Sequence, residues 1–231
     1  MAKSHLDKSA LIIGASRGLG LGLVEEFAVR GWHVTATIRH EPAPVALQKF
    51  SEQVAMEILD INDLNSVTAF LSRTAGQIFD VVFINAGISG PEGKTAETVT
   101  PDEMTHLFMT NAISPVRLGA KLLGNVKPGN GILAFMTSVL GSVTLSGGAY
   151  APLYCASKSA LNQLTRSFVA SMKESITVLS MHPGWVKTDM GGAGADIDVA
   201  TSAKGMVDVL EAKAGSGKHE YLDYRGKTIP W

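Results

Sequence analysis

The amino-acid sequence predicts a doubly wound α/β fold, in which helices cover both faces of a parallel sheet of about seven strands. Short apolar runs without polar interruption alternate with segments of helical periodicity over almost the whole chain. Such apolar runs are typical of strands that are buried on both faces. No repeat, linker or low-complexity stretch divides the 231 residues, so we expect residues 1–231 to form a single domain.

The first half of the chain alternates strands with helices. Apolar runs predict strands at 10–13, 34–38, 54–59 and 79–84. The helix after the first strand is expected to end at Gly31, because glycine is typical of the position that follows a helix. A second helix begins at Asn62 or Asp63, whose side chains can cap its first turn, and ends near Gly76.

The second half begins with a long helix. Thr100 and Glu103 have the spacing of a capping box with Pro101 between them, which predicts a helix that continues to about residue 123. Pro115 has no N–H to donate to the carbonyl oxygen of Asn111, so we expect this helix to bend there. Further strands are predicted at 132–137, 176–181 and 220–222, and further helices around 154–168 and 199–210.

Composition and charge exclude several classes of function. Lys and Arg number 20 against 21 Asp and Glu, so the chain has no basic excess with which to bind nucleic acid. No apolar run approaches the ~20 residues of a membrane span, and the polar residues 1–8 are not a secretory signal. The single cysteine, Cys155, suits a cytoplasmic protein. The six histidines show no metal-ligand spacing, so we expect no metal.

A glycine-rich turn follows the first predicted strand. Gly14, Gly18 and Gly20 form a G-x-x-x-G-x-G pattern that leads directly into a helix. In dinucleotide-binding turns, such glycines let the backbone approach a pyrophosphate, and the helix N-terminus supplies unpaired N–H groups. An ordinary strand–helix turn is the alternative, but the strand before and the helix after favour phosphate binding.

The charges near this turn favour NADP(H) over NAD(H). No acidic residue lies between His33 and His40, where NAD-binding sites carry the carboxylate that holds the ribose 2′-hydroxyl. Arg39 ends the second strand and can pair with a 2′-phosphate through two hydrogen bonds. Arg17, inside the glycine turn, is a plausible second partner. The alternative is that both arginines are solvated surface residues.

Tyr154 and Lys158 stand four residues apart on one predicted helix, so their side chains share a face. A neighbouring ammonium favours the phenolate, so we expect Lys158 to lower the pKa of Tyr154 toward the range useful for acid–base catalysis. Ser138 ends the fifth strand, where its hydroxyl can hold a carbonyl oxygen of a substrate. The alternatives are a surface Tyr–Lys pair and a serine that caps a loop.

These residues together resemble the short-chain dehydrogenase/reductase family, which has the Rossmann fold. The shared motifs, in order along essentially the whole chain, are Gly14-x-x-x-Gly18-x-Gly20, Asn85-Ala86-Gly87, Asn111, Ser138, Tyr154-x-x-x-Lys158 and Pro183-Gly184. Within the family, residues 16–20, 182–192 and 229–231 are similar to the carbonyl reductase branch that includes the C-factor and Sniffer proteins.

The resemblance implies a role for each catalytic position. Tyr154 would be the acid–base residue, and Lys158 would hold the nicotinamide ribose. Ser138 would orient the substrate carbonyl, and Asn111 would complete a proton relay. Independently of the resemblance, Pro115 leaves the carbonyl oxygen of Asn111 without its helical donor, so we expect this oxygen to hold a water molecule that leads to Lys158.

The resemblance also implies which residues bind NADP(H). Asp60 would meet the adenine amino group with Ile61 beside it, residues 85–87 would line the adenosine ribose, and 186 and 188 the nicotinamide amide. The full expected set is Gly14, Ser16, Arg17, Gly18, Leu19, Gly20, Arg39, Asp60, Ile61, Asn85, Ala86, Gly87, Tyr154, Lys158, Pro183, Gly184, Val186 and Thr188.

The sequence departs from the family pattern at three places. Ile13 stands where many members have a threonine whose hydroxyl braces the glycine turn. The 16 positions from Ser138 to Tyr154 predict a longer loop than is common. The glycine-rich residues 191–197 stand in place of a larger substrate lid, so we expect a mobile lid and an open mouth.

We therefore expect an NADPH-dependent reductase of small ketones or aldehydes, which can also run as an alcohol dehydrogenase. Val143, Leu145 and Tyr150 follow Ser138 and predict an apolar substrate. The alternative is a signalling or partner-binding module that retains an NADP site, although such a module has no need of the complete catalytic set. By resemblance we expect a homodimer or homotetramer, assembled through helices around 101–123 and 152–173.

Overall fold

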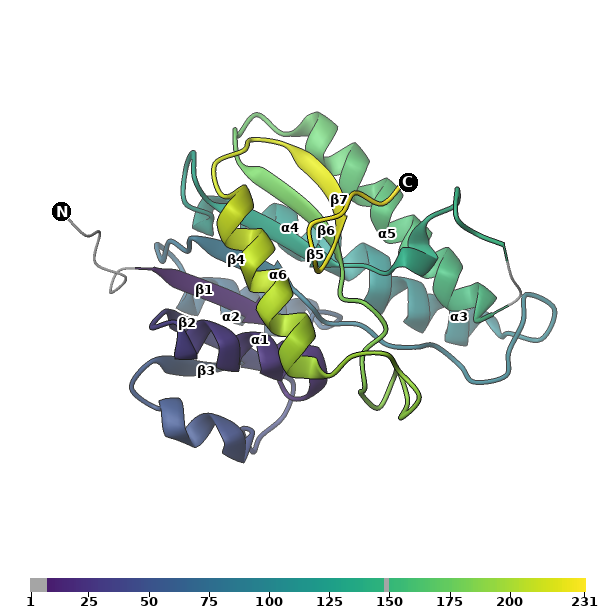
Figure 1. Cartoon of the computed structure of the whole chain (residues 1–231), viewed down its shortest axis with the longest axis horizontal. Coiled ribbons are helices and arrows are strands. Elements are labelled where there is room, and N and C mark those ends of the chain that lie inside the picture. The colour runs from purple at the N-terminus through teal and green to yellow at the C-terminus, as the bar shows by residue number, and fades with distance from the viewer. Residues whose placement is uncertain (1–7, 148–149) are drawn as a thin grey trace.

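Seven parallel strands form one sheet in the computed structural model, which describes residues 8–147 and 150–231 (Figure 1). The strands follow one another across the sheet in the order β3-β2-β1-β4-β5-β6-β7. Their bounds are β1 Ser9–Ile13, β2 His33–Ile38, β3 Val54–Ile58, β4 Val81–Ile84, β5 Ile132–Met136, β6 Thr177–His182 and β7 His219–Asp223. This order reverses direction between β1 and β4, where doubly wound sheets open a crevice for a ligand.

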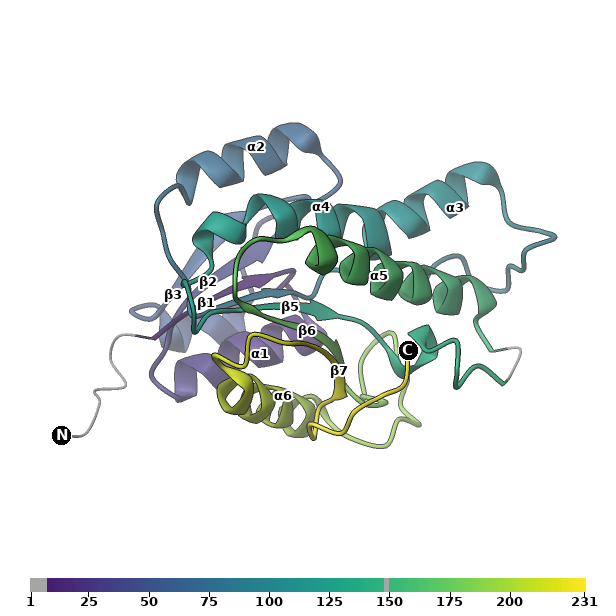
Figure 2. The same ribbon diagram turned by 90° about the horizontal axis from the view of Figure 1, so that it is seen from above.

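Helices cover both faces of the sheet, as the sequence predicts (Figure 2). Helices α1 and α6 lie on one face, and α2, α3, α4 and α5 lie on the other. Their bounds are α1 Gly18–Val29, α2 Leu64–Arg73, α3 Pro101–Phe108, α4 Ser114–Lys121, α5 Pro152–Ser171 and α6 Val199–Lys213. The predicted doubly wound α/β fold is therefore confirmed.

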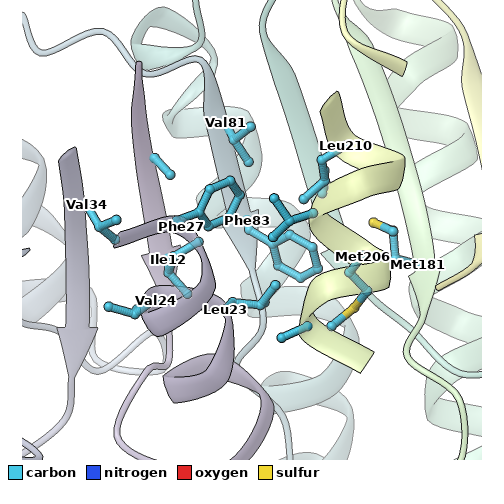
Figure 3. Close-up of a cluster of buried hydrophobic side chains, with 14 of the residues drawn as sticks. Ile12, Leu23, Val24, Phe27, Val34, Val81, Phe83, Met181, Met206 and Leu210 are labelled. Carbon is cyan, nitrogen blue, oxygen red and sulfur yellow. The ribbon is translucent and has the colours of Figure 1, made fainter. Parts of the chain in front are cut away.

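Two apolar clusters hold the helices on the sheet, one on each face. In the first, Phe27 of α1 and Leu210 of α6 meet Ile12 and Phe83 from two neighbouring strands (Figure 3). All four of these side chains are fully buried. Because alternate residues of a strand point to opposite faces, Leu11 and Ile13 contribute to the second cluster instead.

The helix ends follow the local sequence signals. Gly31 follows α1 with a φ of +79°, a conformation that glycine adopts without strain. Asp63 caps α2 by accepting a hydrogen bond from the N–H of Asn65. Thr100 and Glu103 form both hydrogen bonds of the predicted capping box at the start of α3.

The long helix predicted from 101 to about 123 is interrupted. Residues Met109–Ile113 form a π-helical turn, in which the N–H of Ser114 reaches back to the carbonyl oxygen of Met109. Pro115 follows in the first turn of α4, where its missing N–H does least harm. The π-helical turn thus lies where Pro115 predicts a departure from regular helix geometry.

The sequence analysis did not predict three 3-10 turns, which are η2 Val45–Phe50, η4 Leu123–Asn125 and η5 Val139–Gly141.

The described part of the chain leaves out residues 1–7 and 148–149. The prediction that residues 1–8 are not a secretory signal therefore falls almost wholly outside the described residues. Within the described residues, no helix is both long and apolar enough to cross a membrane.

Candidate active site

A cavity of about 480 Å³ lies at the carboxyl ends of the central strands, at the point where the strand order reverses. Most of the predicted cofactor-binding residues line it, together with the Tyr–Lys pair. Those that line it are Gly14, Ser16, Arg17, Gly18, Leu19, Arg39, Asp60, Ile61, Asn85, Ala86, Gly87, Tyr154, Lys158, Pro183 and Thr188. The predicted residues that lie outside its lining are Gly20, Asn111, Ser138, Gly184 and Val186.

The glycine turn is closely packed beneath this cavity. Gly14 has a φ of +87°, and a Cβ there would lie 2.9 Å from the Cα of Ala86. A Cβ on Gly20 would clash with the carbonyl oxygen of Gly14 and lie 2.6 Å from Nδ2 of Asn85. Gly20 therefore acts from behind the turn, which explains why it does not line the cavity although the turn requires it.

The glycine turn leads directly into the N-terminus of α1. Arg17 occupies the N-cap position, and its side chain makes no capping hydrogen bond. Gly18 and Leu19, the first residues of the helix, line the cavity. An uncapped helix N-terminus with a positive dipole end is a binding site for anions such as phosphate.

Thr37 of β2 supplies the hydroxyl that Ile13 lacks. The N–H of Gly14 donates to Oγ1 of Thr37 over 3.0 Å, and the N–H of Ala15 donates to the Thr37 carbonyl oxygen over 2.8 Å. From the other side, Nδ2 of Asn85 donates to the Gly14 carbonyl oxygen over 2.7 Å. The turn is therefore braced by the neighbouring strand, a solution that depends on sheet order.

Both arginines line the cavity. Nη1 of Arg17 forms an ion pair of 2.8 Å with Oδ2 of Asp189, which belongs to the segment after β6. Arg39 is exposed and makes no ion pair within residues 8–147 and 150–231. Lys187 adds a further basic side chain to the lining. The sequence prediction missed Lys187 and Asp189, although both adjoin the Thr188 that it named.

Lys158 is nearly fully buried, with 3% of its surface exposed. Its Nζ donates to the carbonyl oxygen of Met136 over 2.9 Å and lies 5.7 Å from the ring centroid of Tyr154. A Cβ on Gly87 would come within 3.4 Å of this Nζ, so the glycine leaves space for the lysine. Burial lowers the pKa of Lys158 from 10.5 to about 8, because desolvation disfavours the ammonium.

The pKa of Tyr154 is raised, so the expectation from the sequence that it is lowered is wrong. Burial raises the pKa of Tyr154 to about 12, and a hydrogen bond with the Ser138 side chain acts in the opposite direction. Desolvation is the largest cause of the shift because burial disfavours the charged phenolate. Tyr154 is consequently a neutral phenol at physiological pH and has a proton to donate.

Ser138 both caps a turn and faces Tyr154. Its Oγ accepts a hydrogen bond of 3.2 Å from the N–H of Leu140 and so caps η5. Its carbonyl oxygen accepts a hydrogen bond from the buried hydroxyl of Tyr221 on β7. Ser138 therefore caps the loop, as the alternative interpretation expects, and its side chain also contacts Tyr154.

Asn111 is fully buried in the π-helical turn, and its side chain joins two parts of the site. Oδ1 accepts from the N–H of Ile88 over 2.8 Å, and Nδ2 donates to the Ile88 carbonyl oxygen over 2.8 Å. Nδ2 also donates to Oγ of Ser157 over 3.0 Å, and that Oγ donates to the carbonyl oxygen of Tyr154 over 2.7 Å. Asn111 thus ties the segment after β4 to the first turns of α5.

Polar groups line the far end of the cavity beyond β3. Oδ1 of Asp60 accepts from the N–H of Asn62 over 2.8 Å, and Nδ2 of Asn62 donates to Oγ1 of Thr110 over 2.8 Å. Sequence reasoning missed several lining residues, most of which adjoin a predicted position or end a predicted strand. They are Ile13, Thr37, Ile38, Leu59, Asn62, Ile88, Thr110, Met136, Thr137, Lys187, Asp189, Met190 and Val199.

The segment after β6 is held by its own hydrogen bonds. Nε1 of Trp185 donates to the Gly191 carbonyl oxygen over 2.8 Å, and the N–H of Lys187 donates to the Ile197 carbonyl oxygen over 2.9 Å. Val186 is 4% exposed, and Gly184, with a φ of +86°, packs against Ile197. Both residues therefore support the cavity wall from behind. The mobility of residues 191–197 stays a prediction.

Across residues 8–147 and 150–231, no three side chains of His, Cys, Asp or Glu gather where they could hold a metal ion.

Comparison with known proteins identifies the family. A family model described as short chain dehydrogenase matches residues 8–196. C-signal of Myxococcus xanthus is 34% identical over 167 residues, which cover 71% of this chain and 99% of that protein. Two solved structures match 97% of this chain and 99% of theirs. One is a short-chain dehydrogenase/reductase from Burkholderia multivorans with bound NADP, with 38% identity and a TM-score of 0.93. The other is the carbonyl reductase Sniffer of D. melanogaster, with 29% identity and a TM-score of 0.83.

The similarity to the C-factor and Sniffer proteins that the motifs predict is confirmed by these matches. The family model spans the glycine turn, the Tyr–Lys pair and the Pro-Gly segment, all of which the structure brings to one cavity. The chain belongs to the short-chain dehydrogenase family of oxidoreductases.

Proposed function

We propose that this protein transfers a hydride from NADPH to the carbonyl carbon of a small ketone or aldehyde, reversibly, with Tyr154 as the proton donor. The observation that supports this most directly is that Tyr154 and Lys158 line the same cavity as the glycine turn. A phosphate-binding end and an acid–base end thus share one cleft, as a dinucleotide-dependent oxidoreductase requires.

The residues of the cavity fit a dinucleotide. Its volume of about 480 Å³ lies within the ~300–1,000 Å³ that is usual for ligand sites. Gly87 leaves free the space beside Lys158 that a Cβ would fill, and the N-terminus of α1 has no side-chain cap. The proposed set of contacts is Gly14, Ser16, Gly18 and Leu19 for the pyrophosphate, Asp60 and Ile61 for the adenine, Asn85, Ala86 and Gly87 for its ribose, and Pro183 and Thr188 for the nicotinamide.

The charges at the adenosine end favour NADPH over NADH. Arg39 and Arg17 both line the cavity, and we assign the 2′-phosphate to this pair. The relative from Burkholderia multivorans holds NADP. When bound, NADPH supplies the hydride; the protein's own residues supply binding, orientation and the proton.

Tyr154 donates its phenolic proton to the alkoxide that develops on the substrate oxygen. Its raised pKa keeps the proton in place until that stronger base forms. Lys158, with a pKa of about 8, is largely protonated at pH 7, so its ammonium stabilises the new phenolate and can return a proton to it. Ser138 orients the substrate carbonyl, and Asn111 holds α5 so that the Tyr154 backbone stays in register.

Apolar side chains of the segment after β6 and of the loop after Ser138 favour an apolar substrate. Met190 lines the cavity and is half exposed, and Trp185 beside it is also half exposed. Val143, Leu145 and Tyr150 are exposed on the loop after Ser138. Exposed apolar groups around a polar centre are typical of a site that takes a small apolar molecule.

The test is NADPH oxidation across a panel of ketones, aldehydes and quinones, for the native protein and for Tyr154→Phe. We expect turnover with some panel members and its loss in Tyr154→Phe, with NADPH affinity retained. If no panel member supports NADPH oxidation although NADPH binds tightly, the second candidate, a signalling or partner-binding module, is favoured instead. The similarity to C-signal is the observation that supports that candidate.

We also propose that the protein is cytoplasmic and assembles as a homodimer or homotetramer through α3, α4 and α5. Ile113, in the π-helical turn between α3 and α4, and Leu164 of α5 are large apolar residues that are exposed. Light scattering coupled to size-exclusion chromatography measures the mass in solution, and a monomer at micromolar concentration would contradict the assembly.

A further inference from the structure

Tyr221 lies on β7, two strands away from β5 in the sheet, yet its side chain reaches Ser138. Its side chain is 1% exposed, and its hydroxyl donates to the carbonyl oxygen of Ser138, two residues after the end of β5. Strand β6 separates the two in the sheet order. The bond therefore fixes the main chain of Ser138 from outside its own strand pairing.

The last residues of the chain hold the loop that follows Ser138. The carbonyl oxygen of Trp231 accepts hydrogen bonds from the N–H of Thr144 over 3.1 Å and from its Oγ1 over 2.7 Å. Oγ of Ser142 donates to the carbonyl oxygen of Pro230 over 2.6 Å. Figures 1 and 2 both show the C-terminus beside this loop.

The same terminal segment packs on Tyr221. The Trp231 ring lies 5.1 Å from the Tyr221 ring and 4.9 Å from that of His219, with the Arg166 guanidinium 5.1 Å from the Trp231 ring. The N–H of Ile229 donates to the Tyr221 carbonyl oxygen over 2.8 Å. Tyr221 and Trp231 thus form one aromatic cluster. The Tyr221 hydroxyl bonds to Ser138, and the main chain of Pro230 and Trp231 holds residues 142–144.

We infer that Tyr221 is a positioning residue for Ser138, and that residues 228–231 hold the loop after Ser138 against β7. This inference rests on the proposed function, in which the Ser138 hydroxyl orients the substrate carbonyl. The physical reason is that Oγ of Ser138 already caps Leu140, so its direction follows the main chain of residues 138–140. The Ser138 carbonyl oxygen also accepts from the N–H of Gly141 over 2.8 Å, within the turn itself. Without the Tyr221 hydroxyl, this buried carbonyl loses the one of these two donors that anchors it to β7, and that main chain relaxes.

The test is Tyr221→Phe, which removes only the hydroxyl, with Tyr224→Phe as the matched control. The Tyr224 hydroxyl makes no hydrogen bond within the described residues. We expect kcat for the best panel substrate to fall about 5- to 20-fold in Tyr221→Phe, from the loss of one buried hydrogen bond, while the Kd for NADPH stays unchanged. Tyr224→Phe should keep the native kcat.

A double-mutant cycle with Ser138→Ala separates positioning from a general structural effect. If Tyr221 acts through Ser138, adding Tyr221→Phe to Ser138→Ala should change kcat by less than about 2-fold. An equal fall in both backgrounds, or an unchanged kcat in Tyr221→Phe alone, would overturn the inference.

Amide hydrogen exchange provides a readout that does not depend on activity. The N–H groups of Leu140 and Thr144 should exchange faster in Tyr221→Phe than in Tyr224→Phe. If the native protein turns over no panel substrate, the proposed function fails, and exchange alone decides the positioning. Unchanged protection at both amides would then refute it.

Discussion

The ammonium of Lys158 lies 5.7 Å from the ring centroid of Tyr154, and both side chains line the same cavity. Burial moves their pKa values apart, from 10.5 down to about 8 for Lys158 and from 10.0 up to about 12 for Tyr154. Desolvation disfavours the charged form of each group, so burial favours the neutral amine of Lys158 and the neutral phenol of Tyr154. The pair therefore has a tyrosine that keeps its proton and a lysine that titrates near neutral pH.

This burial predicts that Lys158 lowers stability at neutral pH. The unfolded chain binds the lysine proton up to about pH 10.5, whereas the folded protein releases it near pH 8. Below pH 8 the folded protein bears the full cost of the buried ammonium, and the free energy of unfolding rises with pH between 8 and 10.5. Lys158→Met should therefore raise that free energy at pH 7 by about 1–3 kcal/mol while abolishing turnover.

Denaturant unfolding at pH 7 and pH 10 measures the effect, with exposed Lys173→Met as the control. The gain of Lys158→Met over the native protein should shrink at pH 10. A destabilised Lys158→Met protein at pH 7 would contradict the assigned cost.

The ion pair between Arg17 and Asp189 predicts a test of the phosphate assignment. Asp189 holds an arginine that we assign to the 2′-phosphate, so the carboxylate competes with the cofactor. Because both side chains are about three-quarters exposed, Asp189→Asn should tighten NADPH binding only about 2- to 5-fold. Isothermal titration measures it, with exposed Asp196→Asn in the same loop as the control. NADPH affinity that weakens in Asp189→Asn would show that the carboxylate supports the site.

Arg39→Asp should reverse the cofactor preference. A carboxylate at this position repels a 2′-phosphate and accepts a hydrogen bond from a ribose 2′-hydroxyl. We expect the ratio of kcat/KM for NADPH to that for NADH to fall by at least about 100-fold, corresponding to about 2.7 kcal/mol. An unchanged ratio would remove Arg39 from the 2′-phosphate site.

Gly20→Ala should damage the turn although residue 20 does not line the cavity. The added Cβ would meet the Gly14 carbonyl oxygen and Nδ2 of Asn85, both of which are fixed. We expect a loss of about 2–4 kcal/mol in the free energy of unfolding and much weaker NADPH binding. Gly124→Ala, where a Cβ meets nothing within 4 Å, should change stability little. Equal stability of the two variants would contradict the packing argument.

His219 predicts acid sensitivity in the C-terminal segment. Burial lowers its pKa from 6.5 to about 4, so between these values the unfolded chain binds the proton and the folded protein does not. The free energy of unfolding therefore falls as the pH drops from 6.5 to 4. His219→Gln should reduce this fall by about 1–2 kcal/mol, after allowance for partial exposure.

Thermal melts from pH 7 to pH 4 measure the His219 effect, with the exposed His33→Gln as the control. His182, whose pKa is also lowered to about 4 by burial, should leave part of the acid sensitivity in place. Identical pH dependence in His219→Gln and in the native protein would exclude His219 as a source.

The order of the elements could be predicted from the sequence because strand and helix signals are local. Apolar runs marked every strand of the sheet, Gly31 and Asp63 marked helix ends, and Pro115 marked the place where the long helix departs from α-helical geometry. The lining of the cavity by Gly14, Tyr154 and Lys158 also followed, because the carboxyl ends of parallel strands meet at one edge.

Tertiary structure decided what depends on neighbours distant in sequence. Thr37 replaces the hydroxyl missing at residue 13 only because β2 lies beside β1, and Tyr221 reaches Ser138 only because β7 ends the sheet two strands away. The pKa of Tyr154 shows the same limit. Spacing indicates that an ammonium is near, but the extent of burial, which reverses the direction of the shift, follows from packing of the whole chain.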